Sequence, residues 1–242
     1  MNANDDLRPP GGSPTLLRQF ADRATGALSY LLACADSRQA VMIDPVQGDL
    51  SLYLGVLDEL GLCLAYAVDT HLHADHVTGA AALRAATGAR IAVPRHCGAG
   101  GCDLLLADGD RLTAGTIALE VLATPGHTAH SLTLRWRDRL FTGDSLLIGS
   151  AGGTGEPGGD AGRLYDSVTR VLLPLPDETL LYPGHDHQGR RVGCIGEERR
   201  CNPLFAGVSR DEFISRRAAG DDAPPPDAAA CIAANLRCGA PD

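Results

Sequence analysis

Imidazole and carboxylate side chains gather in one short stretch of this chain, THLHADHVTG at residues 70–79. Within six positions it holds four groups that could bind a metal: His71, His73, Asp75 and His76. Imidazole nitrogens and carboxylate oxygens are usual ligands of zinc and iron. In extended backbone alternate side chains point the same way, so His71 and His73 can converge on one point. Asp75 and His76 follow a bend and can face a neighbouring point, so the stretch predicts a metal site.

The flanking residues indicate how this stretch is held. Residues 64–70 form a short, apolar, partly β-branched run that is typical of a buried strand. Residues 78–87 are rich in alanine and leucine, and Thr78 is placed to cap a helix over them. The histidines therefore lie on a strand-to-helix loop, where α/β proteins usually build their sites. A run of polar surface residues is the weaker alternative.

Further ligand-type side chains follow predicted strands elsewhere. His127 lies at the tip of the turn ATPGHTAH, Asp144 follows the strand 139–142, and His185 follows the strand 179–182. Each alone could be ordinary: a turn histidine, a helix cap or a loop residue. Loops at one edge of a sheet system are brought together by the fold, however. We therefore predict that four loops build one site.

The remaining chain alternates strands with helices. Residues 28–34 and 40–43 are predicted strands, the second ended by Asp44 and Pro45, and residues 49–60 form a predicted helix. Later elements are expected at these ranges: a hairpin at 113–122, a strand at 131–136, and helices at 161–173, 197–200 and 210–218.

Composition limits the classes to which the protein can belong. The chain has 242 residues, 44% of them hydrophobic, which suits one large α/β domain. A net charge of −9 argues against a general nucleic-acid surface, and no apolar run is long enough to span a membrane. Residues 1–14 are acidic and rich in proline and glycine, without the features of a targeting signal. We expect a flexible tail at 1–14, one domain at 15–242 and a cytoplasmic protein.

The eight cysteines include no CxxC pair, and disulfides are not expected in a cytoplasmic chain. Most of them should be small buried hydrophobic residues. The run HCGAGGC at residues 96–102 could bind zinc in principle, but its spacing is unusual and no second pair is evident.

Four of these motifs together resemble the metallo-β-lactamase superfamily: HLHADH, GHT, GDS and GHD. The resemblance covers about residues 16–207 and implies an αββα sandwich with metal at one edge of two sheets. Their flanks, with EERRCNP and the terminal ANLRCG, resemble the persulfide dioxygenase family more narrowly. Related thioester hydrolases such as glyoxalase II differ in this C-terminal region. The narrower match extends almost to Gly239 and implies that the C-terminal segment returns toward the active site.

The persulfide dioxygenase resemblance implies one Fe(II) per chain, held by His71, His127 and Asp144. Two histidines and one carboxylate with open positions form the ligand set of non-haem Fe(II) oxygenases. The four remaining ligand-type residues would orient these ligands and shape the water around them: His73, Asp75, His76 and His185. In a hydrolase with two zinc ions the same four would bind metal, and the motif alone does not decide.

The resemblance also implies the reaction. Dioxygen would oxidise a low-molecular-weight thiol persulfide, expected to be glutathione persulfide, to sulfite and free thiol. The metal carries the redox chemistry, and no residue beyond the metal centre is expected to be catalytic. Tyr182, Asn235 and Arg237 are candidates for binding the thiol, since the arginine fork matches a carboxylate. Alternatively, Arg237 holds only the C-terminal segment in place.

Two other functions stay open at this point. A glyoxalase II-like thioester hydrolase would use two zinc ions and need no oxygen. A metal-binding scaffold without turnover is the third. Family members often carry an arginine where this chain has Gly153, which bears on the choice of thiol. Beyond the persulfide and O2, the partners considered are a second copy in a homodimer and a separate rhodanese.

Overall fold

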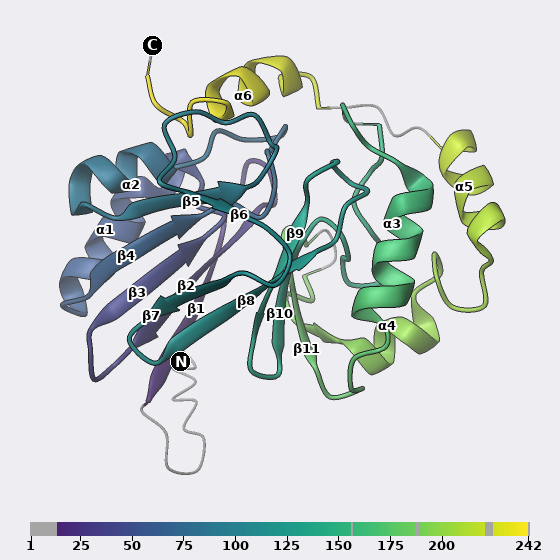
Figure 1. Cartoon of the computed structure of the whole chain (residues 1–242), viewed down its shortest axis with the longest axis horizontal. Coiled ribbons are helices and arrows are strands. Elements are labelled where there is room, and N and C mark those ends of the chain that lie inside the picture. Colours follow the sequence, from purple (N-terminus) through teal and green to yellow (C-terminus); the bar gives the residue numbers. More distant parts are fainter. Residues whose placement is uncertain (1–13, 156, 187–188, 221–224, 242) are drawn as a thin grey trace.

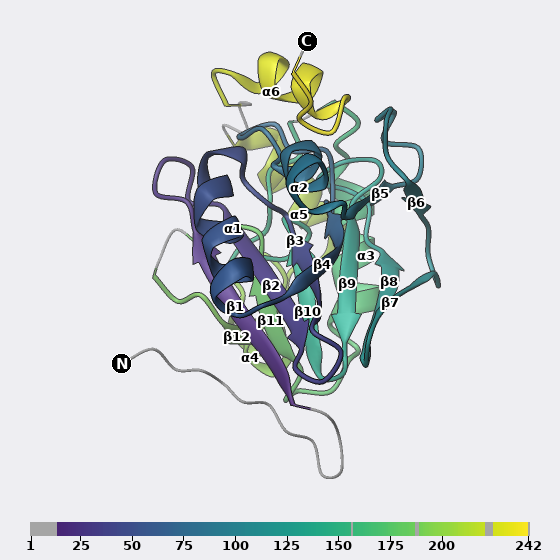
Figure 2. The ribbon, with the colours of Figure 1, turned by 90° about the vertical axis from the view of Figure 1, so that its left-hand side faces the viewer.

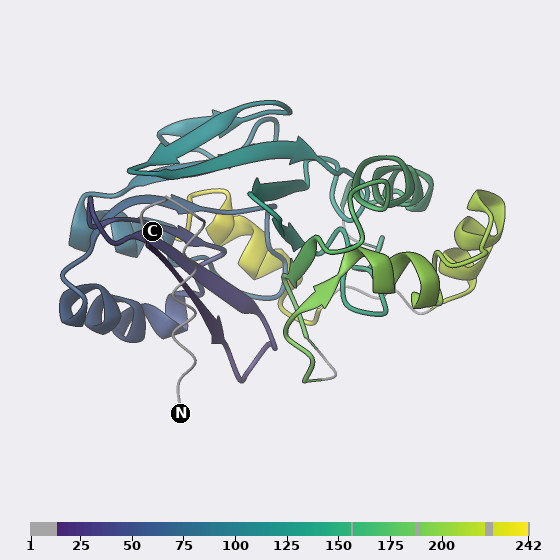
Figure 3. The ribbon, with the colours of Figure 1, turned by 90° about the horizontal axis from the view of Figure 1, so that it is seen from below.

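The computed structural model describes residues 14–155, 157–186, 189–220 and 225–241. Two six-stranded sheets face each other, with helices on their outer sides (Figures 1 and 3). The predicted αββα sandwich is therefore confirmed. The predicted tail at residues 1–14 lies outside the described residues apart from Pro14. No helix within these ranges is long and apolar enough to cross a bilayer.

The first sheet supplies the histidine loop, which we define as residues 70–79. Its strands lie in chain order: β1 (Thr15–Ala21), β2 (Leu28–Cys34), β3 (Gln39–Ile43), β4 (Cys63–Val68), β5 (Arg90–Pro94) and β6 (Leu104–Leu106). The pairs from β3 to β6 are parallel, so each needs a crossover. Two of these crossovers contain α1 (Leu50–Glu59) and α2 (Ala80–Thr87), which cover the outer face (Figure 2).

The second sheet supplies the other ligand-type residues. Its strands, from one edge to the other, are β12 (Gly193–Cys194), β11 (Leu180–Pro183), β10 (Arg139–Gly143), β9 (Leu132–Trp136), β8 (Ile117–Ala123) and β7 (Arg111–Ala114). Only β10 and β11 pair in parallel. Their crossover contains α3 (Ala161–Ser167) and a π-helical turn, η2 (Val168–Leu172), and α4 (Ile195–Cys201) and α5 (Arg210–Ala219) follow.

Three layers of apolar side chains hold the sandwich together. The central layer lies between the sheets and includes the buried rings of Tyr30, Trp136 and Phe141. A second layer packs α1 and α2 on the first sheet, and a third packs α3 to α5 on the second. β2 and β10 are buried along their whole length, so neither strand alternates between buried and exposed residues.

Two local predictions differ from the structure. The helix expected over 161–173 leaves α-helical geometry after Ser167 and continues as η2. Thr78 is not the N-cap of α2, which is Gly79. The Thr78 hydroxyl still accepts a hydrogen bond from Ala80 N–H, the first residue of α2, at 3.3 Å, and it donates to the buried carboxylate of Asp69 at 2.8 Å. The last helix, α6 (Ala228–Asn235), lies beside α2 at the upper end in Figures 1 and 2.

Candidate metal centre

The ligand-type side chains come from the ends of strands in both sheets. The histidine loop follows β4, Asp144 follows β10, His185 follows β11, and His127 lies on the turn between β8 and β9. The carboxyl ends of neighbouring parallel strands share one edge of a sheet. The two sheets therefore present their ligand-type residues at a common edge of the sandwich.

His71, His127 and Asp144 each offer a ligand atom within 4.8 Å of the other two. Nε2 of His127 lies 3.8 Å from Oδ2 of Asp144, and the rings of His71 and His127 meet edge to face with centroids 4.9 Å apart. All three side chains are buried. The three residues expected to bind iron thus lie together, and two imidazoles with one carboxylate suit a first-row transition metal.

The ring of His71 is oriented by Thr70 and Asp44. The Thr70 hydroxyl donates its proton to Asp44 Oδ2 at 2.8 Å, so it can only accept from His71 Nδ1, 3.0 Å away. The ring proton therefore lies on Nδ1, and the Nε2 lone pair is left for a metal. Burial, with the neighbouring His73 and His127, lowers the pKa of His71 well below its ordinary value. The neutral ring that a metal requires is favoured.

The ring of His127 is fixed by the loop after β10. Its Nδ1–H donates to the carbonyl of Gly153 at 2.7 Å, which turns Nε2 toward Asp144. The same loop passes very close to both Asp144 and His127 at Gly152. A Cβ at this residue would stand 2.5 Å from the Asp144 carbonyl oxygen and 2.9 Å from His127 Nδ1. Only glycine lets the backbone approach this closely.

The carboxylate of Asp144 is oriented by His185, which also contacts Asp75. His185 donates from Nδ1 to Asp144 Oδ1 at 2.8 Å and from Nε2 to Asp75 Oδ2 at 3.0 Å. Burial disfavours the charged ring, but the two carboxylates outweigh it and raise the pKa of His185 well above its usual range. Burial likewise opposes ionisation of Asp144, yet His185 holds its pKa far below the ordinary value. Asp144 is therefore ionised, as a metal ligand would have to be.

A second group of ligand-type atoms lies beside the first. His73, Asp75 and His76 offer ligand atoms within 4.8 Å of one another. His76 Nδ1 contacts Asp75 Oδ2 at 2.9 Å, and His73 Nε2 contacts Asp44 Oδ1 at 3.3 Å. Nδ1 of His73 and Nε2 of His76 are buried without a hydrogen-bond partner among the described residues. Orphaned buried nitrogens are uncommon, and a second metal ion would use these two atoms.

Comparisons with known proteins agree with this geometry. Residues 23–185 match the family model described as the metallo-beta-lactamase superfamily. The human protein "Persulfide dioxygenase ETHE1, mitochondrial" is 40% identical over 235 residues, covering 96% of this chain and 92% of that protein. The chain belongs to the persulfide dioxygenase family of this superfamily.

A solved structure and a related hydrolase show how far the similarity extends along the chain. The crystal structure of ETHE1 from Myxococcus xanthus superposes with a TM-score of 0.91 at 44% identity, covering 93% of this chain and all of that one. A hydroxyacylglutathione hydrolase of a Polaromonas species is 38% identical over 176 residues, or 70% of this chain and 66% of that protein. The persulfide dioxygenases thus match more of the chain than this hydrolase does.

The three candidate substrate-binding residues differ in their surroundings. Asn235 is buried, its Oδ1 accepts from Thr78 N–H, and both amide hydrogens go to backbone carbonyls of the histidine loop. Its amide is thus used within the protein, because it positions that loop. The ring of Tyr182 is buried and stacks on Phe141, with centroids 5.4 Å apart. Arg237 is exposed, and its Nη1 donates to Ala233 O at 3.1 Å.

Sequence reasoning missed Asp44 as a part of this site. Asp44 is buried, has a positive φ of 49° and lies in a third ligand-type group with Asp69 and His73. Burial alone would lower the pKa of His73, but Asp44, with Asp69, raises it to about 9. The only signal in the sequence is that Asp44 directly follows a strand. The sequence alone indicates only that Asp44 and Pro45 end that strand.

The cysteines lie outside this centre. All eight are free, which agrees with the expectation that no disulfide forms. None of them joins a group of three ligand-type residues within the described part of the chain, so the HCGAGGC run has no zinc-type cluster there. Four of them, Cys34, Cys97, Cys231 and Cys238, are buried, as expected for small hydrophobic residues, whereas Cys63 and Cys201 are exposed.

Proposed function

We propose that this chain is a persulfide dioxygenase that holds one Fe(II) through His71, His127 and Asp144. The observation that carries the proposal is the ligand set itself: two buried imidazoles and one carboxylate within 4.8 Å, in a chain of this family. Two histidines and one carboxylate leave positions open for molecules from outside the protein. When bound, the iron would supply the redox chemistry between dioxygen and sulfur.

The protein's own residues prepare this position. The Thr70 hydroxyl accepts a hydrogen bond from Nδ1–H of His71, and the Gly153 carbonyl accepts one from Nδ1–H of His127. The Nε2 lone pairs of both histidines are therefore left for the metal. His185 occupies Oδ1 of Asp144, so that Oδ2 is the atom left for the metal. Because the three ligands are oriented before binding, little ordering remains to be done when the ion arrives.

The proposed reaction balances without a further reductant. One thiol persulfide, one O2 and one water give one free thiol, one sulfite and two protons. The outer sulfur loses four electrons and dioxygen gains them, while the bond between the two sulfurs is hydrolysed. Glutathione persulfide is the substrate we propose, and we propose that Tyr182 and Arg237 bind its glutathione part. No cysteine of the protein has to act as a nucleophile.

A thioester hydrolase with two zinc ions is the second candidate. It is favoured by the two orphaned nitrogens, His73 Nδ1 and His76 Nε2, which a second ion would satisfy. Such an enzyme would use metal-bound hydroxide on a carbonyl and would not consume oxygen. The hydrogen bonds from His185 to Asp144 and Asp75 argue against it, because they give these side chains partners without a second metal ion.

The deciding experiment is oxygen uptake. Protein loaded anaerobically with iron receives glutathione persulfide, and uptake is compared with the sulfite formed. Equal amounts of both, with one iron per chain, support the proposal. Iron-loaded protein that consumes no oxygen on any thiol persulfide, but cleaves a glutathione thioester under argon with two metal ions per chain, would establish the hydrolase instead.

Three finer points belong to the same proposal. We place the enzyme in the cytoplasm, although its human, mouse and bovine relatives carry the word mitochondrial in their names. A homodimer and a separate rhodanese as sulfur donor complete it. Size-exclusion chromatography with light scattering tests the homodimer. Oxygen uptake with thiosulfate and glutathione, which should require both the rhodanese and this enzyme, tests the sulfur donor.

A further inference from the structure

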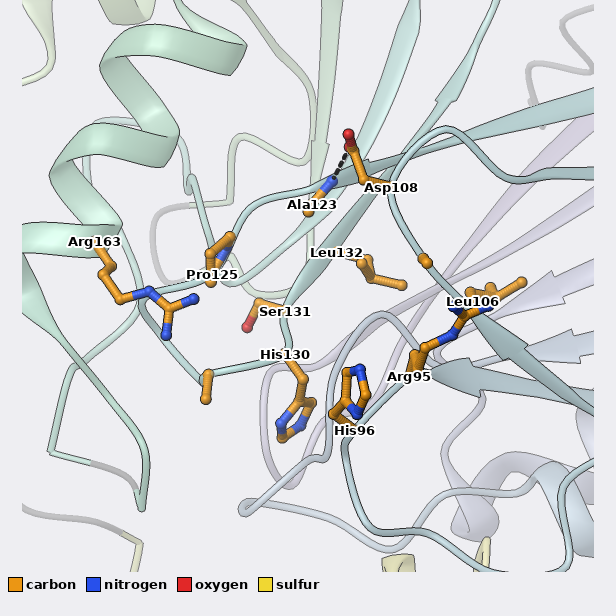
Figure 4. A pocket seen from close by; sticks show the side chains of 12 residues that line it. Arg95, His96, Leu106, Asp108, Ala123, Pro125, His130, Ser131, Leu132 and Arg163 are labelled. Carbon is orange, nitrogen blue, oxygen red and sulfur yellow. Dashed lines mark hydrogen bonds between the residues drawn. The ribbon is translucent and has the colours of Figure 1, made fainter.

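A cavity of about 260 Å³ lies beside the turn that carries His127 (Figure 4). Its walls come from residues 95–96 after β5, residues 106–108 at the end of β6, and residues between 123 and 132. Arg163 of α3 closes one side. Because both sheets and α3 contribute, the cavity is a product of the fold and not of one loop.

The cavity carries positive charge. Arg163 extends toward it from α3 in Figure 4, and Arg95 lies on the opposite side with its guanidinium beside Leu106. Neither guanidinium forms a hydrogen bond or an ion pair with any residue that the structure describes. The carboxylate in the wall, Asp108, accepts a hydrogen bond from Ala123 N–H at 2.8 Å, drawn as the dashed line. In a chain of net charge −9, this is a local excess of unpaired cations.

His130 connects the cavity with the histidine loop. Its Nε2 accepts a hydrogen bond from Leu72 N–H at 3.2 Å, so the ring proton of the neutral imidazole lies on Nδ1, which is a donor. Leu72 stands between His71 and His73 in the loop. A molecule that contacts this ring is therefore one hydrogen bond away from the backbone of the metal site.

The lining indicates what the cavity would hold. Its cationic groups are hydrogen-bond donors, and a guanidinium binds a carboxylate or another oxyanion through two parallel hydrogen bonds. Its remaining wall is apolar, with Leu106, Ala123 and Leu132. A small molecule with an aliphatic body and carboxylate ends matches this combination better than a bare ion does. The volume suits a molecule at the small end of usual ligands.

We infer that this cavity binds a small organic anion, with Arg95 and Arg163 holding its carboxylates. Two sources of oxyanion follow from the proposed function: the carboxylates of the thiol and the sulfite that is released. Only this choice of source rests on the proposed function. The binding itself rests on the cavity, its two unpaired arginines and the donor on His130.

The test uses titration calorimetry on the full chain, loaded with metal and kept under argon so that no turnover occurs. One probe is S-methylglutathione, which has the carboxylates of glutathione but no free thiol to bind a metal. The other is sulfate, which has the oxyanion shape of sulfite without its redox chemistry. The variants are Arg95→Gln and Arg163→Gln, both at exposed side chains. Arg170→Gln is the control, because the Arg170 side chain is 75% exposed and does not line the cavity.

We expect each cavity variant to weaken S-methylglutathione binding about tenfold, because each removes one charge-assisted hydrogen-bonding fork, and the control to match wild type. The same loss for sulfate alone would also support the anion site and assign it to the sulfur oxyanion. Binding that neither cavity variant weakens, or no binding of either probe at millimolar concentration, overturns the inference. Oxygen uptake is not measured here, so this outcome is separate from that of the proposed function.

Discussion

Asp44 holds Thr70 by two hydrogen bonds, one from the backbone amide at 2.7 Å and one from the side-chain hydroxyl at 2.8 Å. The second bond uses the only proton of the hydroxyl, so this oxygen can serve His71 solely as an acceptor. A carboxylate 26 residues from Thr70 in the sequence thereby decides which ring nitrogen of His71 is left for the metal. The finding makes Thr70 and Asp44 part of the metal site.

Replacing Thr70 by valine removes the hydroxyl while nearly keeping the shape of the side chain. His71 then loses its orienting partner, and we expect iron affinity to fall roughly 10- to 100-fold. Competition with a chelator under anaerobic conditions measures this. Thr70→Ser keeps the hydroxyl and should bind iron almost as wild type does. Equal iron affinity in the valine and serine variants would show that the hydroxyl does not orient His71.

Asn235 stabilises the histidine loop from the C-terminal segment. Its Oδ1 accepts a hydrogen bond from the Thr78 amide at 2.9 Å, and its Nδ2 donates to the carbonyls of His73 and His76 at 2.9 and 2.8 Å. Asn235→Ala leaves these buried backbone groups without partners, so the free energy of unfolding should fall by about 3 kcal/mol. Chemical denaturation of the metal-free chain measures the change. A variant as stable as wild type would return Asn235 to the candidates for substrate contact.

Arg237 is the matched comparison, two residues further along. Its side chain is exposed and donates to the carbonyl of Ala233 at 3.1 Å, so Arg237→Ala should change stability by less than about 0.5 kcal/mol. If its guanidinium holds a carboxylate of the thiol, KM for glutathione persulfide should rise about tenfold with kcat nearly unchanged. Steady-state oxygen uptake measures both constants. An unchanged KM would leave Arg237 with a role in the C-terminal turn alone.

The sequence predicts those parts of the site that depend on local sequence patterns. The histidine loop, the turn around His127 and Asp144 at a strand end all follow from strands and turns that can be recognised locally. The role of Asn235 could not be recognised, because its partners lie up to 162 residues away and depend on how the C-terminal segment packs.

Asp44 was missed for a related reason. Its hydrogen bonds cross from β3 to β4, and parallel strands are paired by the fold and not by adjacent sequence. Thr78 shows the same limit, since its hydroxyl binds the buried Asp69, a contact that capping rules cannot foresee. The cavity beside His127 combines residues of both sheets with Arg163 of α3, so no single stretch of the sequence indicated it.

The stability of the fold should depend on the protonation of His130. Burial, with the neighbouring His127 and His73, lowers the pKa of His130 from 6.5 to about 4. The unfolded chain therefore binds a proton that the folded chain does not at pH values between these two. The contribution of the neutral His130 ring to the free energy of unfolding is complete above pH 6.5 and is lost as the pH falls toward 4.

The variant His130→Gln removes this titration. The difference in unfolding free energy between wild type and the variant should shrink by about 1–2 kcal/mol from pH 7 to pH 4.5, after allowance for the partial exposure of the ring. Denaturation of the metal-free chain at a series of pH values measures it. A difference that stays constant over this range would contradict the prediction.

Gly152 should tolerate no side chain, because its backbone lies against both Asp144 and His127. A Cβ there would stand 2.7 Å from the Asp144 Cβ and 2.9 Å from His127 Nδ1, closer than Cβ atoms in folded proteins approach other atoms. Gly152→Ala must displace Asp144 or His127. If these two residues hold iron as proposed, iron content after anaerobic loading should fall at least about tenfold. Gly55→Ala is the control, since a Cβ at Gly55 in α1 meets nothing within 4 Å and alanine favours a helix by about 0.5–1 kcal/mol. If Gly152→Ala loads iron as fully as Gly55→Ala does, the loop after β10 can move away from the ligands, and its contact through Gly153 would not be what fixes His127.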